Sequence, residues 1–360
     1  MYGDRLTRAR ARMAELGVDV LLLSVGPDLP YLTGYEAMPL ERLTMLVVPR
    51  ETDAVLLVPR LEAPRVVERP GVFRLETWDE TDDPVARVGA LAGAATSAAV
   101  GDQTWGRFVL ALQDAMPSTR FRRATDVTGP LRIVKDPAEV DALAAAAHAV
   151  DGIARVMRDR PFAGRTEAEV HRELVERMLD AGHERANFAI VAAGENAASP
   201  HHEPGARVIA DGDVVLCDFG GTMQGYCSDI TRMYAVGEPA AEVRDAYAVL
   251  VEAQEAGVRA AEVGVTCEAV DAAAREVIGA AGLGARFVHR TGHGIGMEAH
   301  EDPYLVAGNG EPLVPGHAFN VEPGIYVSGR FGLRLEDIVV ATAGGPRRLN
   351  EAARDLAVVG

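Results

Sequence analysis

The feature that most constrains this fold is an internal duplication with a period of one hundred residues. A Gly-X-Thr triplet starts at Gly164 and again at Gly264, and each triplet opens a stretch with helical apolar spacing. The two stretches share a threonine suited to a helix N-cap and a glycine suited to a helix end, namely Thr166 with Gly182 and Thr266 with Gly282. Glu169 completes a capping box in the first copy only. The sequence therefore predicts two related halves.

The likeness continues downstream, where each copy carries histidine and then two acidic residues. The histidines are in Pro200-His-His and Gly292-His-Gly, and in each copy a glycine introduces a strand whose first acid follows six residues later. A glycine-rich turn separates the first acid of each copy from the second, giving Asp218 and Asp229, then Glu322 and Glu336. Halves packed about a pseudo-twofold axis would bring these four carboxylates together.

Four carboxylates in apolar, strand-like segments indicate a metal site. For any one acid, a surface position or an ion pair with Arg232 or Arg334 is the simpler explanation, but a duplicated set beside histidines favours metal. Such a site, with one imidazole, suits Mn²⁺, Co²⁺, Fe²⁺ or Zn²⁺. The charge of four carboxylates suits two ions about 3.5–4 Å apart, which can activate water for hydrolysis.

The first part of the chain predicts a separate, smaller α/β domain. A helical pattern over residues 4–16 is followed by apolar runs of strand length at residues 18–23, 45–49, 54–58 and 98–101. Thr-Gly-Pro and Lys-Asp-Pro then interrupt the pattern before an Ala-rich helical stretch over residues 138–159. We therefore expect domains over residues 1–125 and 126–360.

Composition narrows the function classes. A formal charge of −17 disfavours nucleic acid and anionic membranes as partners. No apolar run reaches the ~20 residues of a membrane-spanning helix, and residues 1–12 do not resemble a secretory signal. The three cysteines show no CxxC spacing, which argues against a disulfide framework or structural zinc site. A cytoplasmic location is expected.

Five segments resemble the Xaa-Pro peptidases, the family of prolidase and aminopeptidase P. They are Asp218-Phe-Gly-Gly, Ser228-Asp-Ile-Thr-Arg, His289-Arg-Thr-Gly-His-Gly-Ile-Gly, Glu322-Pro-Gly-Ile-Tyr and Arg334-Leu-Glu-Asp. The likeness is strong over about residues 130–345 and weaker before them. It implies a mixed α/β (α+β) chain, in which a creatinase-type N-terminal α/β domain precedes a pita-bread catalytic domain with pseudo-twofold halves.

The resemblance also implies roles for individual residues. The metal ligands would be Asp218, Asp229, His293, Glu322 and Glu336, with Asp229 and Glu336 bridging two divalent ions. Glu322 would also shuttle a proton, and His201 and His300 would contact substrate and assist catalysis. Arg334 is placed on the substrate side and is expected to orient a metal carboxylate. His289 is expected to support the site, His202 is undecided, and His148, His171 and His183 are expected to face solvent.

The implied activity is hydrolysis of the bond between an N-terminal residue and proline. A prolidase-type dipeptidase is favoured, with Mn²⁺ as the expected ion and Co²⁺ or Zn²⁺ as alternatives. An aminopeptidase P acting on longer peptides stays open, as do a methionine aminopeptidase-like enzyme, a metal-free creatinase-like enzyme and a non-catalytic peptide-binding module. The resemblance further implies short proline-containing peptides as substrates and a homodimer.

Overall fold

The computed structural model describes residues 1–359 and divides into two compact units, Met1–Arg132 and Ile133–Gly360. The boundary expected between residues 125 and 126 falls after the first residue of helix α5 (Thr125–Arg132), and the whole of this helix belongs to the first unit. Two contacts hold α5 there: the Tyr31 hydroxyl donates to the Leu131 carbonyl at 2.9 Å, and buried Arg132 pairs with Asp28 at 2.9 Å.

The first unit is built on a mixed six-stranded sheet with the order β4-β3-β2-β1-β5-β6. Its strands are β1 (Val20–Leu23), β2 (Met45–Pro49), β3 (Val55–Pro59), β4 (Arg74–Trp78), β5 (Ser97–Val100) and β6 (Arg120–Arg123). The four predicted apolar runs are β1, β2, β3 and β5. Successive residues of β1 are all buried, so both faces of the sheet are covered.

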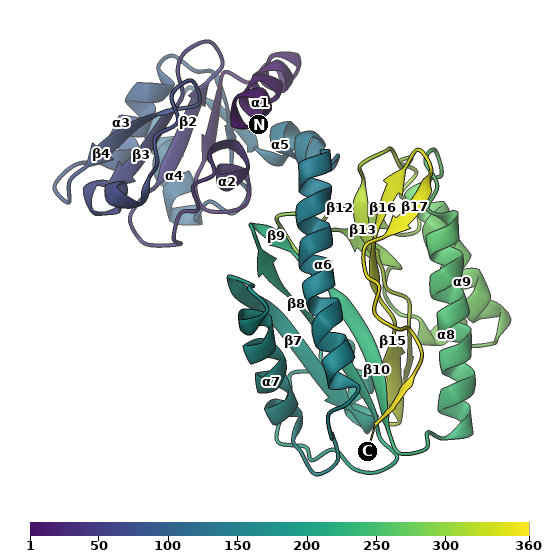
Figure 1. Ribbon diagram of the computed structural model, residues 1–360. Coiled ribbons are helices and arrows are strands. Elements are labelled where there is room, and N and C mark those ends of the chain that lie inside the picture. Colours follow the sequence, from purple (N-terminus) through teal and green to yellow (C-terminus); the bar gives the residue numbers. More distant parts are fainter. Residues whose placement is uncertain (360) are drawn as a thin grey trace. The chain divides into compact units, whose positions relative to one another are not determined.

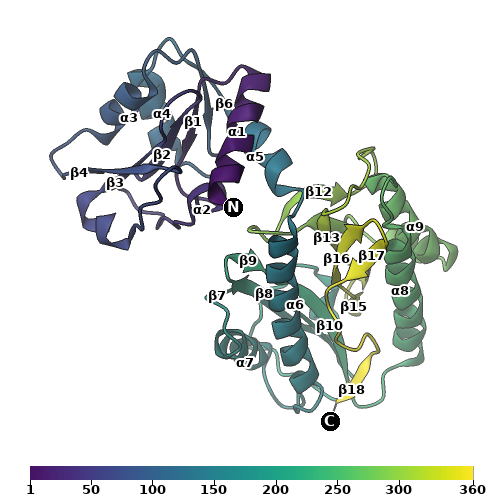
Figure 2. The ribbon, with the colours of Figure 1, turned by 45° about the horizontal axis from the view of Figure 1, so that its top comes forward.

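Helices cover both faces of this sheet. They are α1 (Tyr2–Leu16), α2 (Asp28–Thr33), α3 (Pro84–Ala92), α4 (Gly106–Ala115) and α5, with a 3₁₀ turn η1 (Arg60–Arg65). Val88 of α3 and Leu112 of α4 pack against Val20 and Leu22 of β1. Helices α1 and α5 contact each other on the opposite side (Figure 2).

The second unit contains the predicted duplicated halves, each with a helix pair and a sheet (Figure 1). The first half comprises α6 (Pro137–Met157), α7 (Glu167–Asp180), β7 (Arg185–Ala193), η2 (Gly194–Ala198), β8 (Val214–Met223), β9 (Tyr226–Cys227) and β10 (Ile230–Val236), with β18 (Ala357–Val359) at the sheet edge. The second comprises α8 (Ala241–Ala260), α9 (Cys267–Ala280), η3 (Gly284–Arg286), β11 (Gly292–Gly294), β12 (Glu301–Leu305), β13 (Ala318–Val321), β16 (Asp337–Thr342) and β17 (Gly345–Arg348), plus the hairpin β14 (Gly324–Val327) and β15 (Phe331–Arg334).

The helix signals that defined the duplication are largely confirmed. The Thr166 side chain accepts the Glu169 amide, and the Glu169 carboxylate accepts the Thr166 amide, so the capping box is formed. Gly182 and Gly282 follow the helices with φ of 97° and 75°, the left-handed region that glycine tolerates. Thr266 occupies the second N-cap position, but its side chain forms no capping hydrogen bond.

Helix α7 packs on the outer face of the first sheet, and the opposite face, which carries Asp218, meets residues of the second half along a seam. In the first half, Val170 and Leu174 of α7 pack with Val191 of β7 and Val215 of β8. The seam is closed at Thr231, whose backbone pairs with Asp218 across β8–β10 and forms an isolated bridge with Glu336. Residues from the two halves therefore meet at one backbone position.

The three cysteines, Cys217, Cys227 and Cys267, are free and buried. Among residues 1–359, no helix is both long and apolar enough to cross a lipid bilayer.

Candidate functional site

The four predicted carboxylates converge from the two halves, and three of them lie where strands are interrupted. Asp218 is within β8, whereas Asp229 lies between β9 and β10. Glu322 separates β13 from β14, and Glu336 separates β15 from β16. Together with His293 of β11, they line one cavity of about 810 Å³.

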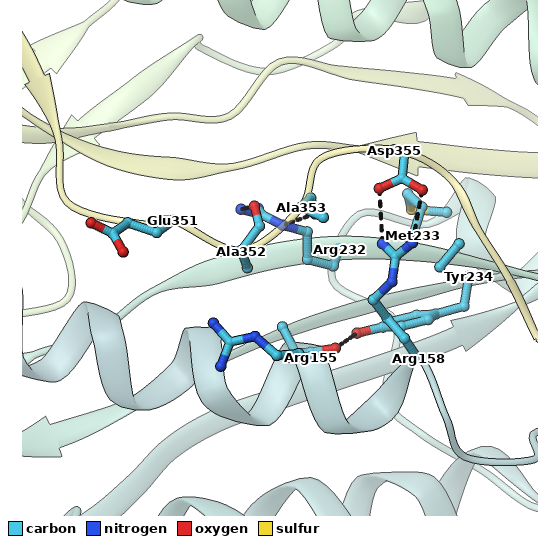
Figure 3. A pocket seen from close by; sticks show the side chains of 11 residues that line it. Arg155, Arg158, Arg232, Met233, Tyr234, Glu351, Ala352, Ala353 and Asp355 are labelled. Carbon is cyan, nitrogen blue, oxygen red and sulfur yellow. Dashed lines mark hydrogen bonds and ion pairs between the residues drawn. The ribbon is translucent and has the colours of Figure 1, made fainter.

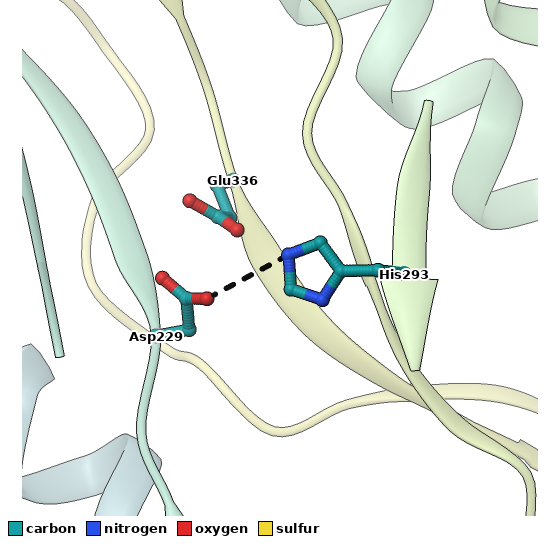
Figure 4. Close-up of side chains that lie close together, drawn as sticks. All are labelled: Asp229, His293 and Glu336. Carbon is teal, nitrogen blue, oxygen red and sulfur yellow. Dashed lines mark ion pairs between the residues drawn. The ribbon is translucent and has the colours of Figure 1, made fainter. Parts of the chain in front are cut away.

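The centre of this cluster is the triad Asp229, His293 and Glu336, whose ligand atoms all lie within 4.8 Å of one another (Figure 4). All three side chains are buried. His293 Nδ1 is 3.1 Å from the Gly294 carbonyl, so the tautomer with the proton on Nδ1 leaves Nε2 free to bind a metal. His293 Nε2 is 3.5 Å from Glu322 Oε1 and 3.9 Å from Asp229 Oδ2.

Glycines on both sides of His293 allow its strand to run very close to its neighbours. A Cβ on Gly292 would collide with the Asn320 carbonyl, and a Cβ on Gly294 would collide with the Asp302 carbonyl. The Gly-His-Gly sequence is thus what lets β11 lie between β12 and β13 and point the imidazole at the carboxylates.

Asn320 of β13 is a site residue that the sequence motifs did not indicate. Its buried amide nitrogen donates to Asp229 Oδ2 at 2.7 Å and to Glu336 Oε1 at 2.6 Å. The other Glu336 oxygen accepts the Thr231 hydroxyl at 2.6 Å. A polar residue in an apolar strand, two positions before Glu322, was the available signal.

Burial and mutual repulsion dominate the electrostatics of the cluster. Burial raises the pKa of Asp229 and Glu336 well above the ordinary values, and neighbouring carboxylates raise them further. Burial also raises the pKa of Glu322 to about 8 and lowers the pKa of His293 to about 3. These residues favour their neutral forms unless cationic charge is supplied.

Arg334 supplies part of that charge and is fully engaged with protein groups. Its Nη2 donates to Asp218 Oδ2 at 2.5 Å, its Nε to the Thr231 hydroxyl at 3.2 Å, and its Nη1 to the Tyr326 hydroxyl at 2.9 Å. Nη1 also donates to the Pro200 carbonyl at 3.1 Å. The expected orientation of a metal carboxylate fits this geometry; a direct substrate contact by Arg334 stays a prediction.

The more exposed residues of the cavity include the two predicted substrate-side histidines. His201 and His300 both line it, and the His300 ring lies 3.9 Å from the His293 ring between centroids. Burial, and then the charge of Arg290, lower the pKa of His300. His289 also lines the cavity, with Nε2 2.9 Å from the Tyr326 hydroxyl, which fits its expected supporting role.

Two histidines expected to face solvent do not. His183 is buried, because its Nδ1 approaches the Met178 carbonyl and its Nε2 lies 2.9 Å from Ser228 Oγ. His171 is half-buried, with Nδ1 2.6 Å from the Ala189 carbonyl, whereas His148 is exposed as predicted. His202, left undecided, contacts Glu167.

A second cavity, of about 220 Å³, lies where α6 ends against residues 351–357 (Figure 3). Arg158 forms a two-pronged pair with Asp355 there, at 2.9 and 2.8 Å. Buried Arg232 donates to the Ala352 carbonyl at 3.0 Å and to the Glu336 carbonyl at 2.7 Å. These contacts tie the C-terminal segment to the backbone of the carboxylate cluster.

The residues present fit divalent ions. Asp218 Oδ1 and Asp229 Oδ1 are buried and accept no hydrogen bond within residues 1–359, which is unfavourable for carboxylate oxygens without a cation. Oxygen ligands with one imidazole are the donor set that Mn²⁺ and similar ions accept.

Comparison with known proteins decides the family. Residues 140–343 match the profile of Metallopeptidase family M24, and residues 5–134 match that of the Creatinase/Prolidase N-terminal domain. The chain belongs to metallopeptidase family M24. The predicted creatinase-type and pita-bread architecture is thereby confirmed, and so is the predicted class of enzyme, a metallopeptidase.

Relatives span the whole chain. "Probable dipeptidase PepE" of Mycobacterium tuberculosis is 43% identical over 100% of this chain and 97% of its own length. "Xaa-Pro dipeptidase" of Lactobacillus delbrueckii subsp. lactis is 31% identical over 96% of each chain. The crystal structure of dipeptidase PepE from Mycobacterium ulcerans is 44% identical, with a TM-score of 0.91 over 99% of this chain and 98% of that one.

Proposed function

We propose that this M24 metallopeptidase is an Xaa-Pro dipeptidase that uses two divalent ions, with Mn²⁺ as the expected metal. The observation that carries the proposal is the convergence of four carboxylates and His293 from the two halves, in a cavity that His201 and His300 also line. The names of the relatives support dipeptides as the substrate class.

Asp218, Asp229, His293, Glu322 and Glu336 would hold the ions. Asp229 and Glu336, which both accept from the Asn320 amide, are the candidates to bridge them. When bound, two such ions supply Lewis-acid activation of a water molecule and of the scissile carbonyl. Arg334 fixes the orientation of the Asp218 carboxylate.

Glu322 is suited to move the proton of the reaction. It lies at the edge of the carboxylate cluster, 3.5 Å from His293, and burial raises its pKa to about 8. A carboxylate at this position can accept the proton of the attacking water and deliver it to the leaving nitrogen. His201 and His300 can stabilise the developing oxyanion from the open side of the cavity.

A proline residue suits the remaining wall of the cavity. Phe188, Ile190, Val288 and Ala299 provide apolar lining beside the polar cluster. A bond that precedes proline lacks an N–H, so recognition depends on apolar contact with the ring.

Arg290 favours a dipeptide over a longer peptide. It lines the cavity, its guanidinium lies 4.2 Å from the Tyr304 ring centre, and within residues 1–359 this guanidinium forms no hydrogen bond or ion pair. A free C-terminal carboxylate on the proline would satisfy this cation with charge-assisted hydrogen bonds. A longer peptide offers only a neutral amide there.

The test is hydrolysis of Ala-Pro and Ala-Pro-Ala by the Mn²⁺-loaded protein, with and without a chelator. Chelator-sensitive cleavage that favours Ala-Pro supports the proposal, whereas faster release of alanine from Ala-Pro-Ala would make the protein an aminopeptidase P. If the protein binds Mn²⁺ but cleaves neither peptide, the proposed specificity for proline is wrong. Asp229→Asn is the matched inactive control. The homodimer and the cytoplasmic location stay predictions.

A further inference from the structure

Glu167, the first residue of helix α7, is a fully buried carboxylate outside the metal cluster. Oε1 accepts the Ala193 amide at 2.8 Å and the Asn196 side chain at 3.0 Å. Oε2 accepts the Gly205 amide at 3.2 Å and lies 2.9 Å from His202 Nε2. The donors all come from residues 193–205, so one carboxylate holds several positions of this loop together.

This loop carries His201. The same loop is held from its other side, where Arg334 Nη1 donates to the Pro200 carbonyl at 3.1 Å. His201 thus lies directly between a residue fixed by Arg334 and a residue fixed by Glu167. Arg334 also holds Asp218, so the loop and the carboxylate cluster share an anchor.

The duplication shows that the fold itself does not require a carboxylate at position 167. The equivalent position one hundred residues later is Cys267, which also starts its helix after a threonine. Cys267 is buried in an apolar cluster with Val270 and Leu313. Both helix starts make the same kind of backbone contact, from Glu167 N to the Arg207 carbonyl and from Cys267 N to the Glu311 carbonyl. The carboxylate of Glu167 therefore serves the loop of the first half and is not needed to start the helix.

We propose that Glu167 and His202 form a clamp that positions His201 for catalysis. The inference rests on the proposed function, in which His201 faces the substrate. Glu167 and His202 are positioning residues: the carboxylate orients the loop backbone, and the His202 side chain, adjacent to His201, locks that orientation. Displacing a catalytic group by about 1 Å can reduce a rate by about a hundredfold.

The decisive experiment is a double-mutant cycle on the full-length, Mn²⁺-loaded protein with Ala-Pro as substrate. His202→Leu removes the donor and should lower kcat by about tenfold or more, while the Mn²⁺ dissociation constant changes by less than about twofold. His202→Gln, which keeps a donor, should recover most of that loss. In a His201→Ala background, His202→Leu should have almost no further effect, because its influence passes through His201.

The controls separate this inference from the proposed function. His148→Leu removes an exposed histidine and should leave kcat unchanged. If His202→Leu lowers kcat in the His201→Ala background as much as it does in the wild-type protein, the proposed clamp is wrong. The dipeptidase assignment would be unaffected by that result. If the wild-type protein cleaves no Xaa-Pro peptide, the proposed function fails.

Amide hydrogen exchange over residues 193–205 tests the clamp without any activity. Glu167→Gln and His202→Leu should speed exchange of the Ala193 and Gly205 amides, which donate to Glu167. Unchanged exchange in both variants would show that the clamp does not hold the loop.

Discussion

Arg334 and Asp218 form a buried pair at 2.5 Å that joins the two halves of the catalytic unit. Asp218 comes from β8 in the first half and Arg334 from β15 in the second. The other N–H groups of Arg334 donate to Thr231, Tyr326 and Pro200, so the guanidinium is held in place and fixes the orientation of the Asp218 carboxylate.

Replacing Arg334 by glutamine should weaken metal binding and activity together. Partners that orient a metal ligand typically contribute 10–100-fold in affinity or rate, so we expect a loss of about that size. Calorimetric titration with Mn²⁺ and steady-state kinetics measure the two effects. Arg330→Gln is the matched control, since Arg330 is an exposed arginine four residues earlier that pairs with Glu242. Equal behaviour of the two variants would contradict the assigned role.

The metal-free protein should lose stability as the pH rises from about 7 to about 8.5. Burial raises the pKa of Glu322 from 4.5 to about 8, so the folded state binds a proton that the unfolded state releases. This contribution is complete below about pH 4.5 and disappears as the pH rises through about 8. With about 1.4 kcal/mol per pKa unit, we expect at least about 1 kcal/mol of loss.

Urea unfolding at the two pH values, in the presence of a chelator, measures this loss. Above about pH 7 the histidine contributions are small, because His293 is neutral in both states. Glu322→Gln should flatten the dependence. Added Mn²⁺ should reverse its sign, because ions bind the ionised carboxylates. A metal-free protein that gains stability with pH would refute this description.

Asn320 should matter for metal affinity as much as for structure. Asn320→Leu keeps the approximate size but removes the donor shared by Asp229 and Glu336. We expect a Mn²⁺ dissociation constant about tenfold or more higher, because two ligands lose their orienting contact. Competition with a metallochromic chelator gives the constant. An unchanged value would mean that the backbone alone positions the two carboxylates.

Arg290→Gln should erase discrimination between Ala-Pro and its C-terminal amide. Charge-assisted hydrogen bonds contribute about 1.5–3 kcal/mol, so the ratio of kcat/KM values for acid over amide should fall about tenfold or more. Arg286→Gln, a change at an exposed arginine outside the cavity, controls for net charge. A ratio that stays constant would assign the dipeptide preference to another feature.

Much of the architecture could be predicted because duplication leaves a periodic signature. The one-hundred-residue offset placed both helix starts, and acids at equivalent positions after Gly212 and Gly316 predicted carboxylates that converge. The pattern could not show that Glu322 and Glu336 lie at breaks between strands. Those breaks flank Pro323 and the short hairpin β14–β15, and strand pairing of this kind is defined only in the folded sheet.

The misjudged residues share one physical cause, which is contact across long sequence separation. His183 looked like a helix-end residue, yet Ser228, forty-five positions away, buries it. Asn320 and Glu167 carry no motif, and their importance arises from partners brought in by other strands and loops. Helix α5 is likewise held in the first unit by partners about one hundred positions away, Tyr31 and Asp28.

The seam at Thr231 has a consequence for synthesis of the protein on the ribosome. Asp218 and Glu336 meet there, although 118 positions separate them along the chain, so the proposed ion pocket cannot form until both have emerged. A nascent or truncated polypeptide that ends before Glu336 cannot assemble the full ligand set. If the proposed ligands bind the ions, metal binding would therefore report that translation and folding of the catalytic unit are both nearly complete.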